Sequence, residues 1–161
     1  MPSSTPESAP ASADGRAEAA AGPTFVENFP GAVDAQWRVT VPAAWRFQDG
    51  LKVHFRLHAD HLEVLPPGEF ERFRKWANET KGPDRRSVMR AWASSLKEAE
   101  IDQAGRLTLP REWAPLVGIE AKSKAMLVGV VEFFEVWSAA SYEADKDGEI
   151  ARGKLLLGGY G

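Results

Sequence analysis

The residues with the most definite chemistry are two arginines, each of which follows an aspartate by four positions. Asp34 precedes Arg38 and Asp102 precedes Arg106, so the same pair recurs 68 residues further along the chain. A guanidinium is a planar fork that can donate two hydrogen bonds to O6 and N7 of a guanine, the commonest specific contact in the DNA major groove. An aspartate at a turn can bond nearby amides or hold the arginine in one orientation. The two pairs are therefore candidate DNA-contacting residues.

The residues after each arginine predict a strand that displays it. Both copies run Arg, aliphatic, Thr, aliphatic, Pro, and alternation along a strand places the aliphatic side chains on the buried face. Arg38 and Thr40 then share the opposite face, as do Arg106 and Thr108. The two threonines are candidate DNA contacts, although threonine is also a common strand former. A surface ion pair that stabilises little is the alternative interpretation of each Asp and Arg, and the duplication disfavours it.

These pairs belong to a longer internal repeat. Residues 33–45 align with 101–113 without gaps, and eight of the thirteen positions keep their residue or their aliphatic character. Weaker similarity links 62–65 to 134–137. Each unit is predicted to run strand, tight turn, strand, short helix, hairpin and helix, which indicates an α+β fold in two equivalent halves. The positions expected to begin and end the two short helices are Pro42, Gly50, Pro110 and Gly118.

A hairpin is predicted in each half. Residues 51–57 alternate between apolar and basic side chains, which is typical of a half-buried strand with a basic outer face, and a partner strand follows the turn at 59–61. In the second half, 125–130 and 133–137 form the equivalent hairpin. Its turn at Val131 lacks the Asn or Gly that is usual there.

Two helices are predicted after the first hairpin. Phe70, Phe73 and Trp76 recur at helical spacing, and Asp84 is placed to cap a second helix that carries Trp92. The helical period favours burial of these aromatic side chains in the core over stacking on bases.

The chain divides into four segments. Residues 1–24 are expected to form a disordered tail, since they contain no large apolar side chain besides Met1, and they lack the cationic start and apolar stretch of a secretory signal. Residues 25–98 form the first half with its helices, and 99–145 form the second half. Residues 146–161, with five glycines, are expected to be a loose C-terminal tail.

Composition narrows the class of protein. With 161 residues, 43% hydrophobic and 27% charged, the chain can bury a core. Its longest apolar run has seven residues, against about 20 for a membrane span, so we expect no membrane partner. The absence of cysteine excludes disulfides and is compatible with the cytoplasm. A formal net charge of −3 lacks the basic excess usual in proteins that hold nucleic acid by bulk electrostatics.

Three histidines raise the question of a metal site. His54 and His58 on one strand are about 13 Å apart, too far to share an ion, and only His58 and His61 can approach each other across the turn. We interpret the region as a solvated strand face, or as a rim that holds phosphate beside Lys52 and Arg56, and expect no metal. Since the chain contains no phosphate loop, dinucleotide fingerprint or nucleophile elbow, we also expect no cofactor and no enzymatic activity.

At the repeated motif the sequence resembles the MraZ family, a two-copy version of the AbrB-like swapped-hairpin barrel. The strongest stretch, 99–137, contains Ala-Glu-Ile-Asp-x-x-Gly-Arg-Leu-Thr-Leu-Pro and later Met-Leu-Val-Gly-Val and Phe-Glu-Val-Trp-Ser. Weaker similarity runs from residue 24 to about 142. The resemblance implies an α+β fold consisting of a duplicated AbrB/MraZ-like swapped-hairpin β-barrel with flanking helices.

The same resemblance implies a function and its residues. Family members are bacterial transcriptional regulators that bind G-containing direct repeats upstream of the cell-division and cell-wall gene cluster and assemble into homo-oligomeric rings. The partner would be double-stranded DNA in the cytoplasmic nucleoid. Arg38 and Arg106 would contact the DNA, with Asp34 and Asp102 at the other end of the motif, and no cofactor is implied.

Two departures from the family pattern leave an alternative open. Lysines that relatives often carry beside the Asp or Gly are replaced by Ala35-Gln36 and Gln103-Ala104. Trp37 also stands where the second copy has Gly105, which predicts a differently shaped first loop, because a bulky residue disfavours a positive φ. The alternative function is a ring-forming scaffold or protein-binding adapter that has lost useful DNA affinity.

Overall fold

The computed structural model of the chain describes residues 23–46 and 51–160. The N-terminal tail that is expected to be disordered, 1–24, lies outside the described residues except for its last two positions. Gly50, which is expected to end a helix, also lies outside them.

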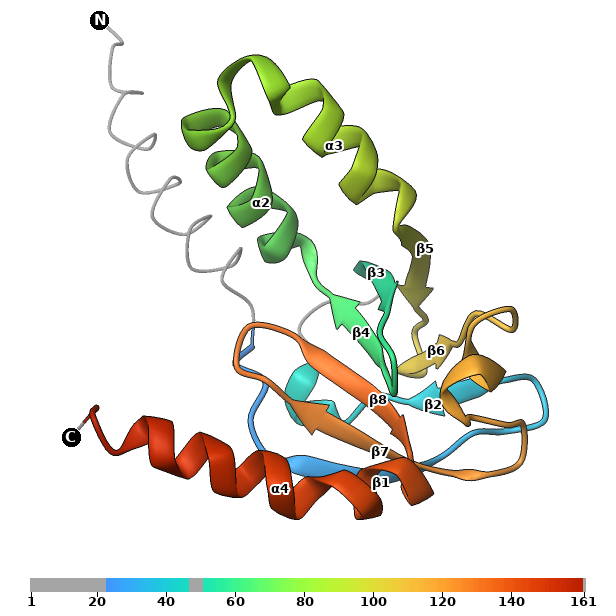
Figure 1. Ribbon diagram of the computed structural model, residues 1–161. Coiled ribbons are helices and arrows are strands. Elements are labelled where there is room, and N and C mark those ends of the chain that lie inside the picture. Colours follow the sequence, from blue (N-terminus) through green and yellow to red (C-terminus); the bar gives the residue numbers. More distant parts are fainter. Residues whose placement is uncertain (1–22, 47–50, 161) are drawn as a thin grey trace, which may run out of the picture.

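Six strands form one antiparallel sheet in which the two halves are interleaved (Figure 1). The first half contributes β1 (Asn28–Ala32), β3 (Leu51–Leu57) and β4 (Leu62–Leu65), and the second contributes β5 (Leu96–Ile101), β7 (Lys124–Gly129) and β8 (Phe134–Ser138). The order across the sheet is β1-β7-β8-β4-β3-β5. β1, β3 and β4 correspond in the repeat to β5, β7 and β8. Equivalent strands therefore follow in the same order from either edge of the sheet.

The sheet is open, where the sequence predicts a closed barrel. β1 and β5 lie at its two edges, and the two remaining strands, β2 (Arg38–Thr40) and β6 (Arg106–Thr108), pair only with each other. These two strands are three residues long and end just before Pro42 and Pro110, which cannot donate to a ladder, so they form a separate ribbon. The α+β class, with an antiparallel sheet and flanking helices, is confirmed.

The hydrophobic core joins the sheet to this ribbon. β3 alternates between buried and more exposed positions, as its sequence predicts. Val39 of β2 and Leu107 of β6 are buried in the same cluster as Phe55 of β3 and Phe134 of β8. The ribbon is therefore anchored by apolar side chains from both halves.

Two short 3-10 helices follow the ribbon, with boundaries that differ from prediction. Pro42 precedes the first, η2 (Ala43–Trp45), because its own backbone is extended at ψ 143°. The second, η4 (Ala114–Val117), begins four residues after Pro110. Gly118 ends η4 with a φ of 80°, as predicted.

Helices α2 (Pro67–Thr80) and α3 (Arg85–Ser94) project from the sheet as a hairpin (Figure 1). The prediction that their aromatic side chains lie in the core is wrong. Trp76 is 44% exposed, while Phe73 stacks on Trp92 with ring centroids 3.9 Å apart. These aromatics pack mainly between the two helices, and Phe70 also packs on His54 of β3 with ring centroids 4.1 Å apart. Asp84 occupies the N-cap position of α3 without a side-chain capping bond.

The last helix, α4 (Ala139–Leu157), replaces most of the predicted loose tail. Ser138 starts it, since its Oγ accepts a hydrogen bond from the backbone N–H of Ser141 at 3.0 Å. Gly148 and Gly153 lower the helix propensity, but no proline interrupts the segment. Among the described residues, no helix is both long enough and apolar enough to cross a bilayer.

Candidate nucleic-acid interface

Asp34 and Asp102 organise two turns of the same design. Oδ1 of Asp34 accepts hydrogen bonds from the backbone N–H groups two and four positions ahead, both at 2.9 Å. Oδ1 of Asp102 accepts the equivalent pair at 2.9 and 2.8 Å. Each aspartate thus shapes the turn through one oxygen and leaves Oδ2 available to the arginine that follows.

The two arginines emerge on one face of the β2–β6 ribbon. The antiparallel register places Arg38 opposite Thr108 and Thr40 opposite Arg106. The aliphatic pair between them, one residue from each strand, is buried. The four residues therefore share the outer face, in the arrangement that strand alternation predicts.

Each turn is bonded to the strand of the other half. The N–H of Val41 donates to the carbonyl of Gly105 at 2.8 Å, and the N–H of Leu109 donates to the carbonyl of Trp37 at 2.7 Å. Moving one turn would therefore displace the strand that carries the other arginine. The two arginines are held as one unit.

The prediction that Trp37 reshapes the first turn is wrong. Trp37 has a φ of 64°, close to the 80° of Gly105, and its N–H donates to the Asp34 carbonyl at 3.0 Å. The equivalent bond in the second turn, from Gly105 to Asp102, is 2.9 Å long. A left-handed backbone costs an ordinary residue about 1–2 kcal/mol. Packing of the half-buried Trp37 ring on the core and the turn's hydrogen bonds offset that cost.

The aspartates fix the guanidinium groups without enclosing them. Nε of Arg38 donates to Oδ2 of Asp34 at 2.8 Å, and Nε of Arg106 donates to Oδ2 of Asp102 at 3.0 Å. The arginine side chains remain 29% and 41% exposed. Nη2 of Arg38 also reaches Oε1 of Gln36 at 3.3 Å, whereas the terminal amino groups of Arg106 have no hydrogen-bond partner in the described part of the chain. Arg106 can therefore offer both terminal amino groups to a ligand.

Both aspartates are held in the charged form. The backbone N–H of Arg38 is the largest factor that lowers the pKa of Asp34, assisted by its guanidinium, and Arg106 acts on Asp102 in the same way. At neutral pH each arginine is therefore neutralised in part by its own aspartate. This local charge balance favours recognition by directed hydrogen bonds over attraction by bulk charge.

Arg46 is a further cation at the second turn that sequence reasoning did not identify. Its Nη1 donates to the carbonyl of Ala104 at 3.4 Å, although the two residues lie 58 positions apart. A Cβ on Gly105 would come within 2.1 Å of this guanidinium. No local pattern marks Arg46, because only the interleaving of the two halves brings it to the turn.

The basic face predicted for β3 is neutralised. Lys52 and His54 both lie near Glu98, at 3.6 and 3.5 Å, and Arg56 lies 2.7 Å from Glu63. Since Lys52 and Arg56 already face carboxylates, and burial lowers the pKa of His54, the arrangement disfavours the phosphate-holding rim considered from the sequence.

Comparisons with known proteins agree on one family. A model of the family described as "MraZ protein, putative antitoxin-like" matches residues 94–148. A "Transcriptional regulator MraZ" from Corynebacterium kroppenstedtii is 31% identical over 137 residues, covering 80% of this chain and 93% of the relative. Proteins of the same name from Alcanivorax borkumensis and Syntrophobacter fumaroxidans are 32% and 30% identical. They share 73% and 71% of this chain with 84% and 82% of their own.

Proposed function

The chain belongs to the MraZ family, whose named members are transcriptional regulators, and on that premise we propose that it binds double-stranded DNA through the β2–β6 ribbon. The observation that carries the proposal is the pair of equivalent arginines on one face of the ribbon. Arg38 and Arg106 read guanines, and Asp34 and Asp102 keep them in position. Thr40 and Thr108, on the same face, are further contacts.

The geometry of the arginines suits base recognition. Because Nε is occupied by the aspartate, the two terminal amino groups of Arg106 form the free end of the fork. Two parallel hydrogen bonds from that end match O6 and N7 of one guanine. The rigid coupling of the two turns keeps the two forks in a fixed relation, which favours bases at a fixed separation over isolated guanines.

The target class follows from the family. We propose G-containing direct repeats upstream of the cell-division and cell-wall gene cluster, bound in the cytoplasmic nucleoid. A chain with a formal net charge of −3 gains little from bulk attraction to phosphates. A homo-oligomeric ring of intertwined, swapped-hairpin units compensates for this weak attraction. When one ribbon is bound, the effective concentration of the other ribbons at the neighbouring repeats rises, without new contacts per chain.

Fluorescence anisotropy tests the proposal. The probes are a labelled duplex of the chain's own upstream region and a random duplex of equal length, at low and moderate salt. We expect tighter binding to the upstream duplex. Arg106→Ala should remove about 1–3 kcal/mol of that discrimination, a loss of roughly 5- to 150-fold.

Arg152→Ala is the matched control, because it removes the same charge from the exposed surface of α4, away from the ribbon (Figure 1). It should leave the discrimination unchanged. Equal weakening of both duplexes by Arg106→Ala would indicate a phosphate contact and contradict base reading. Equal binding of both duplexes by the unmodified chain would contradict the proposal and favour the ring-forming adapter.

A further inference from the structure

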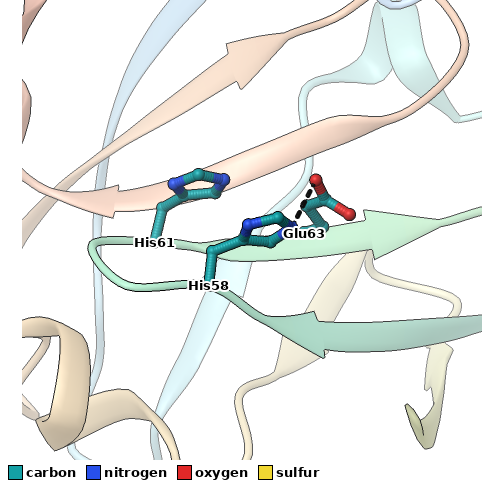
Figure 2. Close-up of side chains that lie close together, drawn as sticks. All are labelled: His58, His61 and Glu63. Atoms are coloured by element: carbon teal, nitrogen blue, oxygen red, sulfur yellow. Dashed lines mark ion pairs between the residues drawn. The ribbon is translucent and has the colours of Figure 1, made fainter. Parts of the chain in front are cut away.

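The turn between β3 and β4 brings two histidines together beside one carboxylate (Figure 2). The rings of His58 and His61 lie parallel with centroids 4.7 Å apart. Nε2 of His58 is 2.7 Å from Oε2 of Glu63. One donor atom from each of these three residues lies within 4.8 Å of the other two. Sequence reasoning paired the histidines across the turn but did not include the glutamate.

A second glutamate faces the pair from the other half of the chain. Strand pairing puts Glu135 of β8 directly opposite Glu63 of β4, and the two are equivalent positions of the repeat. Oε2 of Glu135 is 3.2 Å from Nε2 of His61. Glu63 is 5% exposed and the Glu135 side chain 15%, so two carboxylates are largely buried side by side. Like charges opposite one another destabilise a sheet unless cations compensate them, and Arg56 compensates Glu63.

Surrounding donors leave one oxygen of each carboxylate facing a histidine. Arg56 donates to Oε1 of Glu63 at 2.9 Å, and the indole N–H of Trp137 donates to Oε1 of Glu135 at 2.8 Å. The two remaining Oε2 atoms are the ones that face His58 and His61. Supporting bonds of this kind, which orient a ligand through its other atom, are typical of metal sites.

The histidine nitrogens lack hydrogen bonds where a cation would bind. Nδ1 of His61 is 2.7 Å from Oδ1 of Asp60, so in the neutral tautomer with its proton on Nδ1 the ring donates to Asp60 and presents the lone pair of Nε2 to a cation. Nε2 of His61 and Nε2 of His58 are both buried and have no correctly oriented hydrogen-bond partner in the described part of the chain. Two such nitrogens beside carboxylate oxygens are the donor set that zinc and its neighbours in the first transition row prefer.

We propose that His58, His61 and Glu63 bind a divalent transition-metal ion, with Glu135 as a fourth ligand, and that the ion ties the β3–β4 turn to β8. Ligands bonded at about 2.0–2.1 Å lie roughly 3.3 Å apart around a tetrahedral zinc, whereas the donor atoms of His58, His61 and Glu63 now lie within 4.8 Å of one another, so they move closer together on binding. Two parallel imidazoles cannot both point at one ion. The His58 ring therefore turns on binding, which its 39% exposure permits.

The site is specific to the first half. The positions in the second hairpin that correspond to His58 and His61 are Val130 and Phe133, so the repeat supplies a second carboxylate but no second pair of imidazoles. One ion per chain is therefore expected. Because its ligands come from both halves, the ion should stabilise the fold as well as bind to it.

Calorimetry with zinc chloride on the untagged, chelator-treated full chain tests the proposal. We expect one zinc per chain and a rise in melting temperature on zinc addition. His58→Gln should weaken binding at least tenfold and abolish the rise. His54→Gln changes a histidine of β3 outside the cluster; it is the matched control and should bind as the unmodified chain does.

Nuclear magnetic resonance provides a measurement without a variant. The chain has three histidines, so their ring nitrogens can be followed individually. Zinc should shift the Nε2 signals of His58 and His61 and leave His54 unchanged. The proposal is overturned if the full chain binds no zinc at a stoichiometric concentration, if His58→Gln binds it equally well, or if the ring signals of His58 and His61 do not move.

Discussion

Asp34 and Asp102 each serve two roles with one side chain. One oxygen builds the turn by accepting two backbone N–H groups, and the other holds the arginine that follows. Replacing either aspartate by asparagine would keep an oxygen for the backbone bonds and remove the charge. The substitution therefore separates the local fold from the electrostatic hold on the guanidinium.

Asp102→Asn should lower the stability of the fold at neutral pH, and this loss should be smaller at acidic pH. Backbone and guanidinium hydrogen bonds from Arg106 hold the pKa of Asp102 below its ordinary value of 3.8. The folded state thus favours the carboxylate form. The resulting stability is present above pH 3.8 and is lost as the pH falls through the lower folded-state pKa. Urea unfolding midpoints should therefore differ at pH 7 and converge once the pH falls below the folded-state pKa.

Glu79→Gln, which removes an exposed carboxylate from α2, is the control for charge alone. Its urea unfolding midpoint should show no difference from that of the unmodified chain that is present at pH 7 and disappears in acid. An unchanged gap between Asp102→Asn and the unmodified chain across the whole pH range would contradict the electrostatic explanation.

Among the elements, the β7–β8 hairpin contains a strained turn. Val131 has a φ of 66°, and the N–H of Glu132 donates to the carbonyl of Val130 at 2.7 Å, which closes a three-residue turn. A positive φ is unfavourable for a β-branched residue. The turn is retained because the N–H and carbonyl of Val131 both bond to Phe25, at 2.8 and 3.0 Å.

Val131→Asn should raise stability by about 1 kcal/mol, because asparagine tolerates this backbone region and Val131 is 55% exposed. Chemical unfolding provides the measurement. Val26→Asn is the matched control, since Val26 is 49% exposed but has no positive φ, and it should give no gain. A loss of stability in Val131→Asn would contradict the prediction, because it would show that the valine side chain stabilises the fold by more than its positive φ destabilises it.

Local patterns predicted the strands well and the helices less well. The alternation in β3 and the repeated strand after each arginine depend on neighbouring residues, so both were correct. The glycine-containing end of α4 was misjudged because two glycines weaken a helix without ending it. The aromatics of α2 have the period of a buried helix face, but the sequence does not reveal that the face is covered mainly by α3.

In the two candidate sites, too, the features with a local sequence signal could be predicted and those that depend on long-range pairing could not. The pairing of Arg38 and Arg106 with their aspartates could be predicted because each pair is local and duplicated. Positive φ at Trp37 could not, since its carbonyl accepts a hydrogen bond from Leu109 of the other half and its ring packs on the core that both halves form. The contact between Glu135 and His61 depends on the pairing of β4 with β8, which joins residues 74 positions apart and leaves no local signal.

At the scale of the whole molecule, the two halves interlock. β1 of the first half pairs with β7 of the second, and β5 of the second pairs with β3 of the first. The ribbon adds a third pairing between the halves. Neither half can form its sheet alone, so the two arginines are presented only by the complete fold.

The N-terminal segment should weaken DNA binding by its charge. Residues 1–22 contain Glu7, Asp14, Glu18 and one arginine, which account for −2 of the formal net charge of −3. If the chain binds DNA through its arginines, these acids compete with phosphates for them. The triple variant Glu7→Gln, Asp14→Asn, Glu18→Gln keeps the length, and it should tighten binding to the upstream duplex by roughly two- to tenfold at low salt.

The gain should disappear at about 0.5 M salt, because charges separated by more than a few ångströms are then screened. The control removes three acids from α2 and α4 instead, as Glu79→Gln, Asp147→Asn and Glu149→Gln. An equal gain in this control would assign the effect to net charge rather than to the segment. Unchanged affinity in both variants would contradict the prediction, because it would mean that these carboxylates do not compete with phosphates for the arginines.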